Sequence, residues 1–293
     1  MPSLLRSWPL AGLAALAALG LAACSSDSTG SNGTPALSVA MADSLAEAVT
    51  VDADEMIMSS SFNAATGVGL AAPPSIPIAP PCTPTVSPLP VTNGDADVFP
   101  DSVRLSFACN WTVGVLSYAL TGLVDVVDPT PVNTDFNVKG VFTDFRRSRT
   151  NTLLTRTWSA TYNGSRQIAA SPDTLGHTIT NFQTDYSFAN GRTARHLKNW
   201  HGKFTADVAG TIAEGSPLPD GTFDLSGSST WTHGTDVFDL TLSTSPGLHY
   251  DANCTQAPKF DSGTTTIVVT RNGNSSTVTI QHLACGVFTV TRS

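Results

Sequence analysis

The sequence has few charged side chains, and lysine in particular is scarce. Charged residues make up 13% of the 293 residues, with 23 Asp and Glu against 15 Lys and Arg, and only four of the basic residues are lysines. The net charge is −8 at pH 7. This acidic balance argues against nucleic acid or an anionic membrane surface as a partner, because both bind basic patches.

Long apolar runs are also missing, apart from one near the N-terminus. Residues 8–23 carry no charge and are mostly Leu and Ala, but this run is too short for a permanent membrane-spanning helix. Arg6 precedes it, and a basic start before a short apolar run is typical of a secretory signal. We therefore interpret residues 1–23 as a signal peptide. Without it, 14 basic residues face 23 acidic ones, a net charge of −9.

The end of this run carries a more specific pattern. Leu21-Ala22-Ala23-Cys24 resembles the lipobox of bacterial lipoproteins. The resemblance implies cleavage before Cys24, a diacylglycerol on its thiol and an acylated amine, which together form a stable membrane anchor. Ser25 follows, and by similarity to enterobacterial sorting rules it favours the outer membrane, with the domain in the periplasm or at the surface. Residues 24–36 are small and polar and predict a flexible tether.

Four more cysteines remain after acylation of Cys24: Cys82, Cys109, Cys254 and Cys285. An even number in an exported chain predicts disulfides, because that compartment is oxidising. Three connectivities are open, and we favour Cys82–Cys109 with Cys254–Cys285 because each pair closes a loop of moderate length. No CxxC spacing occurs, which argues against zinc or redox chemistry.

The mature chain is expected to begin with a helical segment and a connector. Residues 37–61 predict a helix that Ser38 could cap, with a possible break near 50–54. Residues 71–90 are so rich in proline that they predict an extended connector. The apolar positions of the helix recur at helical spacing: Val39, Ala42, Leu45, Ala46, Val49 and Met56.

Residues 91–293 show the alternation of β-strands. Phe238, Leu240 and Leu242, for example, are separated by polar residues, which is typical of a half-buried strand. We expect ten to thirteen strands in an all-β fold: a large antiparallel sheet of sequential hairpins, as an open or curved sheet, half-barrel or sandwich. Three Asn-Gly pairs predict hairpin turns: Asn163-Gly164, Asn190-Gly191 and Asn272-Gly273.

One short segment resembles a calcium-binding loop. Oxygen-bearing side chains recur at relative positions 1, 3, 5 and 9: Asn93, Asp95, Asp97 and Asp101. Closely spaced carboxylates of this kind wrap hard cations. Val98 stands where a turn glycine is expected, and Arg104 where the bidentate Glu should be. The alternative is a polar turn leading into a strand at Val103, and no other cofactor is expected.

Histidines and arginines offer weaker candidates. His196 and His201 have odd separation, so a regular strand places them on opposite faces and they cannot share a metal. We interpret these and the isolated His233 and His249 as strand-surface or turn residues. The basic cluster in DFRRSR could contact an acidic partner or form a solvated patch at a strand end; its arginines are Arg146, Arg147 and Arg149.

The mature chain holds four tryptophans, which could stack on sugar rings or pack in the core: Trp111, Trp158, Trp200 and Trp231. Trp158 shares its phase with Leu154 and Tyr162, and Trp231 with Phe223, so core packing is the favoured interpretation.

No catalytic motif stands out. GxSxG, HExxH, the P-loop, GxGxxG and zinc spacings are all absent, which favours a non-enzymatic role. The leading hypothesis is a lipid-anchored envelope module for binding, adhesion or structure, whose ligand could be protein, glycan or lipid. One alternative is a carrier of lipid or another hydrophobic ligand, with an open half-barrel and the N-terminal helix as a lid. The other is an envelope hydrolase with a carboxylate site.

Overall fold

The fold was determined as a computed structural model, which describes residues 37–60, 82–88, 92–94, 100–131, 136–171, 173–189, 191–213 and 216–293. These residues form one helix and thirteen strands: α1 (Val39–Ser60), β1 (Thr85–Ser87), β2 (Ser102–Val113), β3 (Leu116–Val127), β4 (Asn137–Asn151), β5 (Arg156–Ala170), β6 (Thr174–Ser187), β7 (Thr193–Ala206), β8 (Gly221–His233), β9 (Asp236–Thr244), β10 (Leu248–Tyr250), β11 (Phe260–Arg271), β12 (Asn274–Ala284) and β13 (Val287–Arg292).

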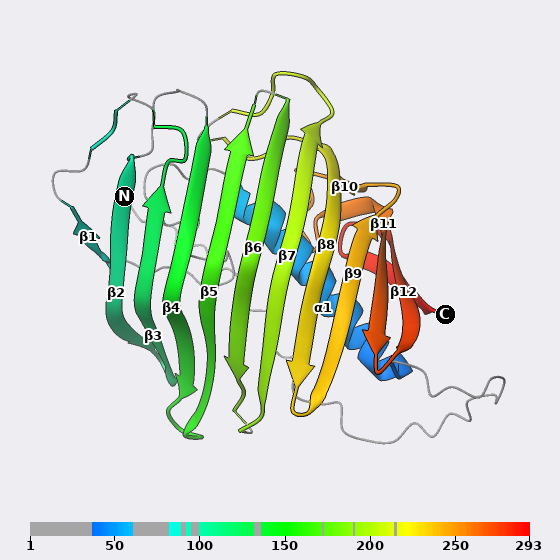
Figure 1. Cartoon of the computed structure of the whole chain (residues 1–293), viewed down its shortest axis with the longest axis horizontal. Helices are drawn as coiled ribbons and strands as arrows, with labels where there is room; N and C mark the ends of the chain where they lie inside the picture. The colour runs from blue at the N-terminus through cyan, green and yellow to red at the C-terminus, as the bar shows by residue number, and fades with distance from the viewer. Residues whose placement is uncertain are drawn as a thin grey trace, which may run out of the picture. The chain divides into compact units, whose positions relative to one another are not determined.

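All thirteen strands belong to one antiparallel sheet. Strands β1 to β8 pair in sequence order, β9 and β10 both lie between β8 and β11, and β11 to β13 complete the sheet (Figure 1). The central strands are long, with 15 residues each in β4 and β5. The predicted all-β fold of sequential hairpins is therefore confirmed.

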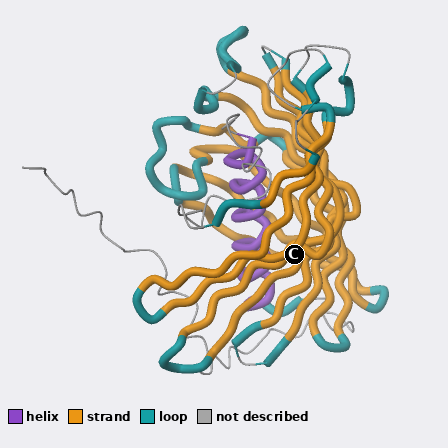
Figure 2. Tube along the Cα trace, turned by 90° about the vertical axis from the view of Figure 1, so that its left-hand side faces the viewer, coloured by secondary structure: helices purple, strands orange, loops and turns teal. Residues whose placement is uncertain are grey.

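Helix α1 lies on one face of this sheet (Figure 2). Ser38 caps it, because its side-chain oxygen accepts a hydrogen bond from Met41 N at 3.3 Å and so pairs one of the free amides of the first turn. The helix runs unbroken through residues 50–54, so the expected break is wrong. Tertiary packing outweighs the weak propensity there, since Val49 and Ala53 are buried. Within the described residues, no helix is long and apolar enough to cross a bilayer.

The hydrophobic core lies between α1 and the sheet face that it covers. Strand β7 shows why: every second residue from Ala194 to Ala206 is buried, and the residues between are exposed or half-buried. Large rings fill the space between helix and sheet, and Trp200, Phe204 and Phe223 are each no more than 1% exposed. The helix and the sheet share this single core.

The Asn163-Gly164 pair does not form the predicted hairpin turn. It lies inside β5, where the register shifts in both neighbouring pairings. Asn163 Oδ1 accepts a hydrogen bond from Asp144 N of β4 at 2.8 Å. Gly164 has φ +118°, and a Cβ there would lie 2.3 Å from the carbonyl oxygen of Asn181. The pair therefore makes a bulge, which bends the strand.

The same arrangement recurs on both sides of β5. Three glycines with φ above +100° lie against the backbone of a residue with a large buried ring: Gly122 against Phe145, Gly164 against Phe182, and Gly227 against Trp200. Asp144 and Asn181, just before two of these rings, themselves adopt positive φ. The register shifts thus form a line across the sheet from β3 to β7, while Gly227 of β8 pairs with both of its neighbours without a shift.

Of the other two Asn-Gly predictions, the one at Asn272-Gly273 is confirmed. Asn272 and Gly273 have φ values of 51° and 79° and join β11 to β12, as a type I′ hairpin turn requires. Asn190 lies outside the described residues, but Gly191 N donates to Phe188 O at 2.9 Å in the turn between β6 and β7.

Both predicted disulfides are present. Cys82–Cys109 joins the segment before β1 to β2, with Cα atoms 5.5 Å apart. Cys254–Cys285 joins the loop before β11 to the turn after β12, with Cα atoms 5.8 Å apart. The first therefore fixes the end of the Pro-rich connector to the sheet, and the second closes the segment that contains the β11–β12 hairpin. Most of the predicted connector lies outside the described residues.

Candidate functional site

Polar side chains gather where α1 meets the middle of the sheet. This helix–sheet polar cluster comprises Asp52, Thr184, His196, Lys198 and Ser229. Thr184 on β6 is directly opposite His196 on β7, and Lys198 on β7 is opposite Ser229 on β8. The strand alternation that buries Trp200 therefore also points His196 and Lys198 toward the helix.

A buried ion pair forms the centre of the cluster. Lys198 Nζ donates to Asp52 Oδ2 at 3.2 Å, and the two side chains are 4% and 17% exposed. The ammonium also lies 5.4 Å from the centre of the Trp200 ring and 5.9 Å from that of Phe182. Since a buried lysine needs a partner to stay charged, Asp52 and the aromatic faces together stabilise the cation.

His196 lies beside this pair as a neutral ring. Burial, and then the charge of Lys198, lower the pKa of His196 to about 3, while Asp52 acts in the opposite direction. Its Nδ1 is 3.7 Å from Asp52 Oδ2, which is too long for a hydrogen bond. The ring instead packs edge-on against Trp231 and Trp200, with centroids 5.2 and 5.9 Å away.

Several polar atoms of the cluster have no hydrogen-bond partner among the described residues. They are Thr184 Oγ1, His196 Nε2 and Ser229 Oγ. Buried polar atoms usually bind ordered water or a ligand when protein partners are missing. Hydroxyls, a neutral imidazole and an ion pair could together hold water or a small polar molecule, but α1 covers them in this conformation.

A second polar contact fixes the C-terminal half of α1. His177 Nδ1 on β6 lies 3.1 Å from Met56 O, and because a carbonyl oxygen only accepts, Nδ1 carries the proton. Burial and the nearby charge of Arg166 lower the pKa of His177 to about 3. The ring is therefore neutral and donates to the helix backbone.

A third histidine, His249 on β10, is held between two aspartates. Its Nε2 lies 3.0 Å from Asp207 Oδ2 and its Nδ1 2.7 Å from Asp261 Oδ1. These hydrogen bonds, the one to Asp207 first, raise the pKa of His249. Ser262 Oγ donates to Asp261 at 3.2 Å. When protonated, His249 donates to both carboxylates and so joins the loop after β7 to β11.

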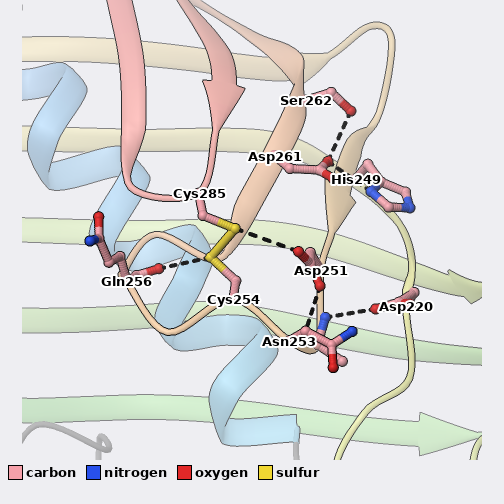
Figure 3. The surroundings of a disulfide bond; sticks show 10 residues. Asp220, His249, Asp251, Asn253, Cys254, Gln256, Asp261, Ser262 and Cys285 are labelled. Atoms are coloured by element: carbon pink, nitrogen blue, oxygen red, sulfur yellow. Dashed lines mark hydrogen bonds and ion pairs between the residues drawn. A yellow bond between two sulfur atoms is a disulfide. The ribbon is translucent and has the colours of Figure 1, made fainter.

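Figure 3 places His249 and Asp261 near the Cys254–Cys285 disulfide. Asp251 Oδ1 accepts from Asn253 N at 2.8 Å in the turn before Cys254, and Asp220 accepts from Ala252 N at 2.8 Å. These carboxylates are occupied by backbone amides. Within the described ranges no group of three or more His, Cys, Asp or Glu could hold a metal ion.

The predicted calcium segment is described only in part. Asp95 and Asp97 lie outside the described residues. Asp101 Oδ1 accepts a hydrogen bond from Gly94 N, next to Asn93, at 2.7 Å. That bond is the kind that closes a polar turn before β2, and calcium binding stays untested.

The histidine predictions need one correction. His196 is 3% exposed and His201 is exposed, so the expected opposite faces are confirmed, but His196 is a core residue rather than a surface one. His249 does have partners, two aspartates distant in sequence. The shared phase of Lys198, Trp200 and Phe204 could have signalled that polar residues of β7 face the core.

The arginine cluster is only partly solvated. Arg146 is exposed, but Arg147 is 6% exposed. Arg147 Nη1 lies 3.4 Å from Tyr162 Oη, and its guanidinium is 5.9 Å from the centre of the Tyr162 ring. The prediction of a solvated patch is therefore wrong for Arg147, because the adjacent positions of a strand face opposite sides.

The tryptophans follow the core interpretation to different degrees. Trp200 is fully buried, while Trp111 and Trp231 are half-buried and pack against the core. Trp158 is half-buried, and Leu154 is exposed in the turn before its strand rather than sharing its phase.

Comparison with known proteins yields no relative from which a role could be transferred. No protein-family model matches the chain, and no curated protein or solved structure matches it significantly.

Proposed function

We propose that this chain is a lipid-anchored, non-enzymatic β-module of the bacterial cell envelope, which binds an envelope component or has a structural role. The observation that carries the proposal is Leu21-Ala22-Ala23-Cys24 at the end of a short apolar run. Acylated Cys24 would hold the module at a membrane. In a bacterium with two membranes, Ser25 after Cys24 favours the outer one.

The polar groups of the fold support a non-enzymatic role. Lys198 is paired with Asp52, and His177 donates to the backbone of α1. His249 lies between two carboxylates that fix a loop. These contacts hold elements together, and α1 covers the polar cluster beneath it. Polar side chains that pair with one another beneath a helix favour a stable module over an active site, because an active site must be open to its substrate.

The anchor is tested by labelling cells with radioactive palmitate. The wild-type protein should incorporate label and fractionate with membranes, and Cys24→Ala should do neither. The variant Cys254→Ala/Cys285→Ala is the matched control, because it also loses cysteines but should remain labelled. Equal labelling of the wild type and Cys24→Ala would end the lipoprotein proposal.

A second candidate function is a carrier of a hydrophobic ligand with α1 as its lid. It is favoured by the rings that α1 covers, Trp200 and Phe204 among them, and by the small residues Ala42, Ala46 and Ala53 that the helix buries. A ligand could replace these small side chains if α1 moved. In a fluorescent fatty-acid titration, Asp52→Asn should then bind more tightly than wild type, since the ion pair that holds α1 is broken. No binding by either protein would remove this candidate.

A further inference from the structure

Two neighbouring hairpin turns expose large apolar side chains. The turn between β2 and β3 presents Val113 and Val115, which are 62% and 43% exposed. The turn between β4 and β5 presents Leu153 and Leu154, which are 76% and 60% exposed. We call these four residues the apolar tip. Exposed apolar groups gathered in this way mark a surface that contacts something else.

Hydrogen bonds hold the apolar tip in place. Thr152 donates to Val115 O from its backbone N at 2.9 Å and from its hydroxyl at 3.1 Å, which joins the two turns. Asn151 Oδ1 accepts from Leu153 N and Leu154 N at 3.1 and 3.0 Å. The leucines therefore project from an ordered turn, and a partner would not need to order them.

Aromatic rings and an arginine lie behind the apolar tip. Trp111 stacks on Tyr118 across β2 and β3, with ring centroids 5.4 Å apart. Tyr118 is opposite Arg149 on β4, which is opposite Trp158 on β5. All four are half-buried. This row stands two to four residues behind the tip, or roughly 7–13 Å at 3.3 Å per residue.

The charge around the apolar tip is opposite to that of the whole chain. Residues 102–124 and 145–172 contain no Asp or Glu, although acidic residues outnumber basic ones overall. Arg146 and Arg156 are exposed and Arg149 is half-buried. The positive surface lies on the β4–β5 hairpin, because the one arginine of β2 and β3, Arg104, is paired with Asp125.

We propose that the apolar tip inserts into the surface of a lipid bilayer that carries anionic headgroups. The order of groups along the strands matches the layers of a bilayer. Aliphatic side chains come first, then rings of the kind enriched at membrane interfaces, and arginines able to bind lipid phosphates. The choice of a bilayer over a protein partner rests on the proposed lipid anchor.

The fold places the tip and the start of α1 at the same end of the sheet. The tight turns after β2, β4, β8 and β11 all lie at the lower end in Figure 1, and α1 begins at that end beside β12. Residues 24–36, thirteen in all, can span at most about 45 Å to α1. The tether is thus long enough for this end of the sheet to approach a membrane that holds Cys24.

The test uses the chain from Ser25 to Ser293, which lacks the anchor but keeps the core, since the buried core residues in the described part of the chain lie between Leu37 and Ile280. It should sediment with vesicles of phosphatidylglycerol and phosphatidylcholine. The amount that sediments with vesicles of pure phosphatidylcholine should be at least tenfold lower. Leu153→Ser/Leu154→Ser should lower binding at least tenfold. The control Leu283→Ser/Val287→Ser removes residues of 52% and 49% exposure near the opposite end and should bind like wild type.

Other outcomes separate this inference from the anchor. No vesicle binding by the parent chain, or equal binding by the leucine variant with an unchanged melting temperature, would overturn the insertion. Self-association that the leucine variant abolishes, without vesicle binding, would make a second copy the occupant and also overturn it. Because this chain lacks Cys24, each result is independent of palmitate labelling, so the two proposals fail separately.

Discussion

Lys198 and Asp52 are 146 residues apart in sequence, yet Lys198 Nζ lies 3.2 Å from Asp52 Oδ2 beneath α1. This contact sets the position of the helix on the sheet in a way that apolar packing alone would not, because small apolar side chains tolerate sliding. There is better evidence that buried ion pairs fix the alignment of packed elements than that they add to the net free energy of unfolding.

Removing one partner of this pair should destabilise the fold. Asp52→Asn leaves the Lys198 charge buried without a counterion, and we expect a loss of about 3 kcal/mol in the free energy of unfolding. The double variant Asp52→Leu/Lys198→Met should recover most of it, since both desolvated charges are then gone. Urea unfolding measures both.

An exposed ion pair provides the control for the Asp52 and Lys198 variants. Arg195 lies 2.7 Å from Asp185, but the side chains are 57% and 36% exposed. Arg195→Met should therefore change the free energy of unfolding by less than about 1 kcal/mol. Similar losses for Arg195→Met and Asp52→Asn would contradict the role given to burial.

His282 should make the fold sensitive to acid. Burial lowers the pKa of His282 to about 4, so the unfolded chain takes up a proton near pH 6.5 while the folded chain does not. The associated stability is complete above pH 6.5 and is lost as the pH falls toward 4. At pH 5 the loss is about 2 kcal/mol at most.

The variant His282→Phe isolates this effect. The ring lies between Phe260 and Phe288, with centroids 5.2 and 5.8 Å away, and phenylalanine fits such surroundings. Urea unfolding at pH 7.5 and 5 should show a smaller pH dependence for His282→Phe than for wild type. An equal slope for His282→Phe and the wild type would refute the assignment.

The bulge at Gly164 should not tolerate a side chain. In Gly164→Ala the new Cβ would lie 2.3 Å from Asn181 O and 2.7 Å from Phe182 Cα, at φ +118°. We expect a loss of about 3 kcal/mol or more in the free energy of unfolding. Gly191→Ala is the matched control, since Gly191 also has positive φ but nothing within 4 Å. It should lose only about 1 kcal/mol.

The Cys254–Cys285 disulfide should contribute a large share of stability. It closes a loop of 31 residues, for which the chain-entropy relation gives about 3–4 kcal/mol. Cys254→Ala/Cys285→Ala should therefore shift the urea midpoint markedly. Peptide mapping of the wild-type protein without reduction should recover Cys82–Cys109 and Cys254–Cys285, and recovery of Cys82 linked to Cys254 or Cys285 would mean that the topology is wrong.

Calcium should have no effect on melting if residues 93–101 form only a polar turn. Asp101 already accepts the Gly94 amide, which agrees with a turn. We expect the melting temperature to be the same with millimolar calcium and with chelator. A rise that Asp95→Asn abolishes would establish the site instead.

Much of the fold followed from local patterns. Period-two alternation predicted the strands, Asn272-Gly273 predicted its turn, and the sequence proximity of the cysteines predicted both disulfides. These signals work because a strand with one buried face needs alternating side chains and a tight turn needs residues that accept positive φ. The helix at 39–60 was likewise visible in its apolar spacing.

The polar sites were not predictable in the same way. Alternation assigns Lys198 to a face, but it does not say that α1 will lie on that face or that Asp52 will meet the ammonium. Asn163-Gly164 satisfies the rule for a hairpin turn, and its place inside β5 depends on a neighbouring backbone that needs the room. His249 gains its partners from a loop and from another strand.

The sequence by itself therefore determined the strand pattern, the helix and the pairing of cysteines, because each depends on residues close along the chain. The secretory signal and the lipobox stay predictions. The tertiary structure decided which polar residues are buried and paired, where the sheet carries its bulges, and which hairpin turns expose leucine beside arginine. These properties depend on the register between distant strands and on the face that α1 covers, and both are settled only when the whole core packs.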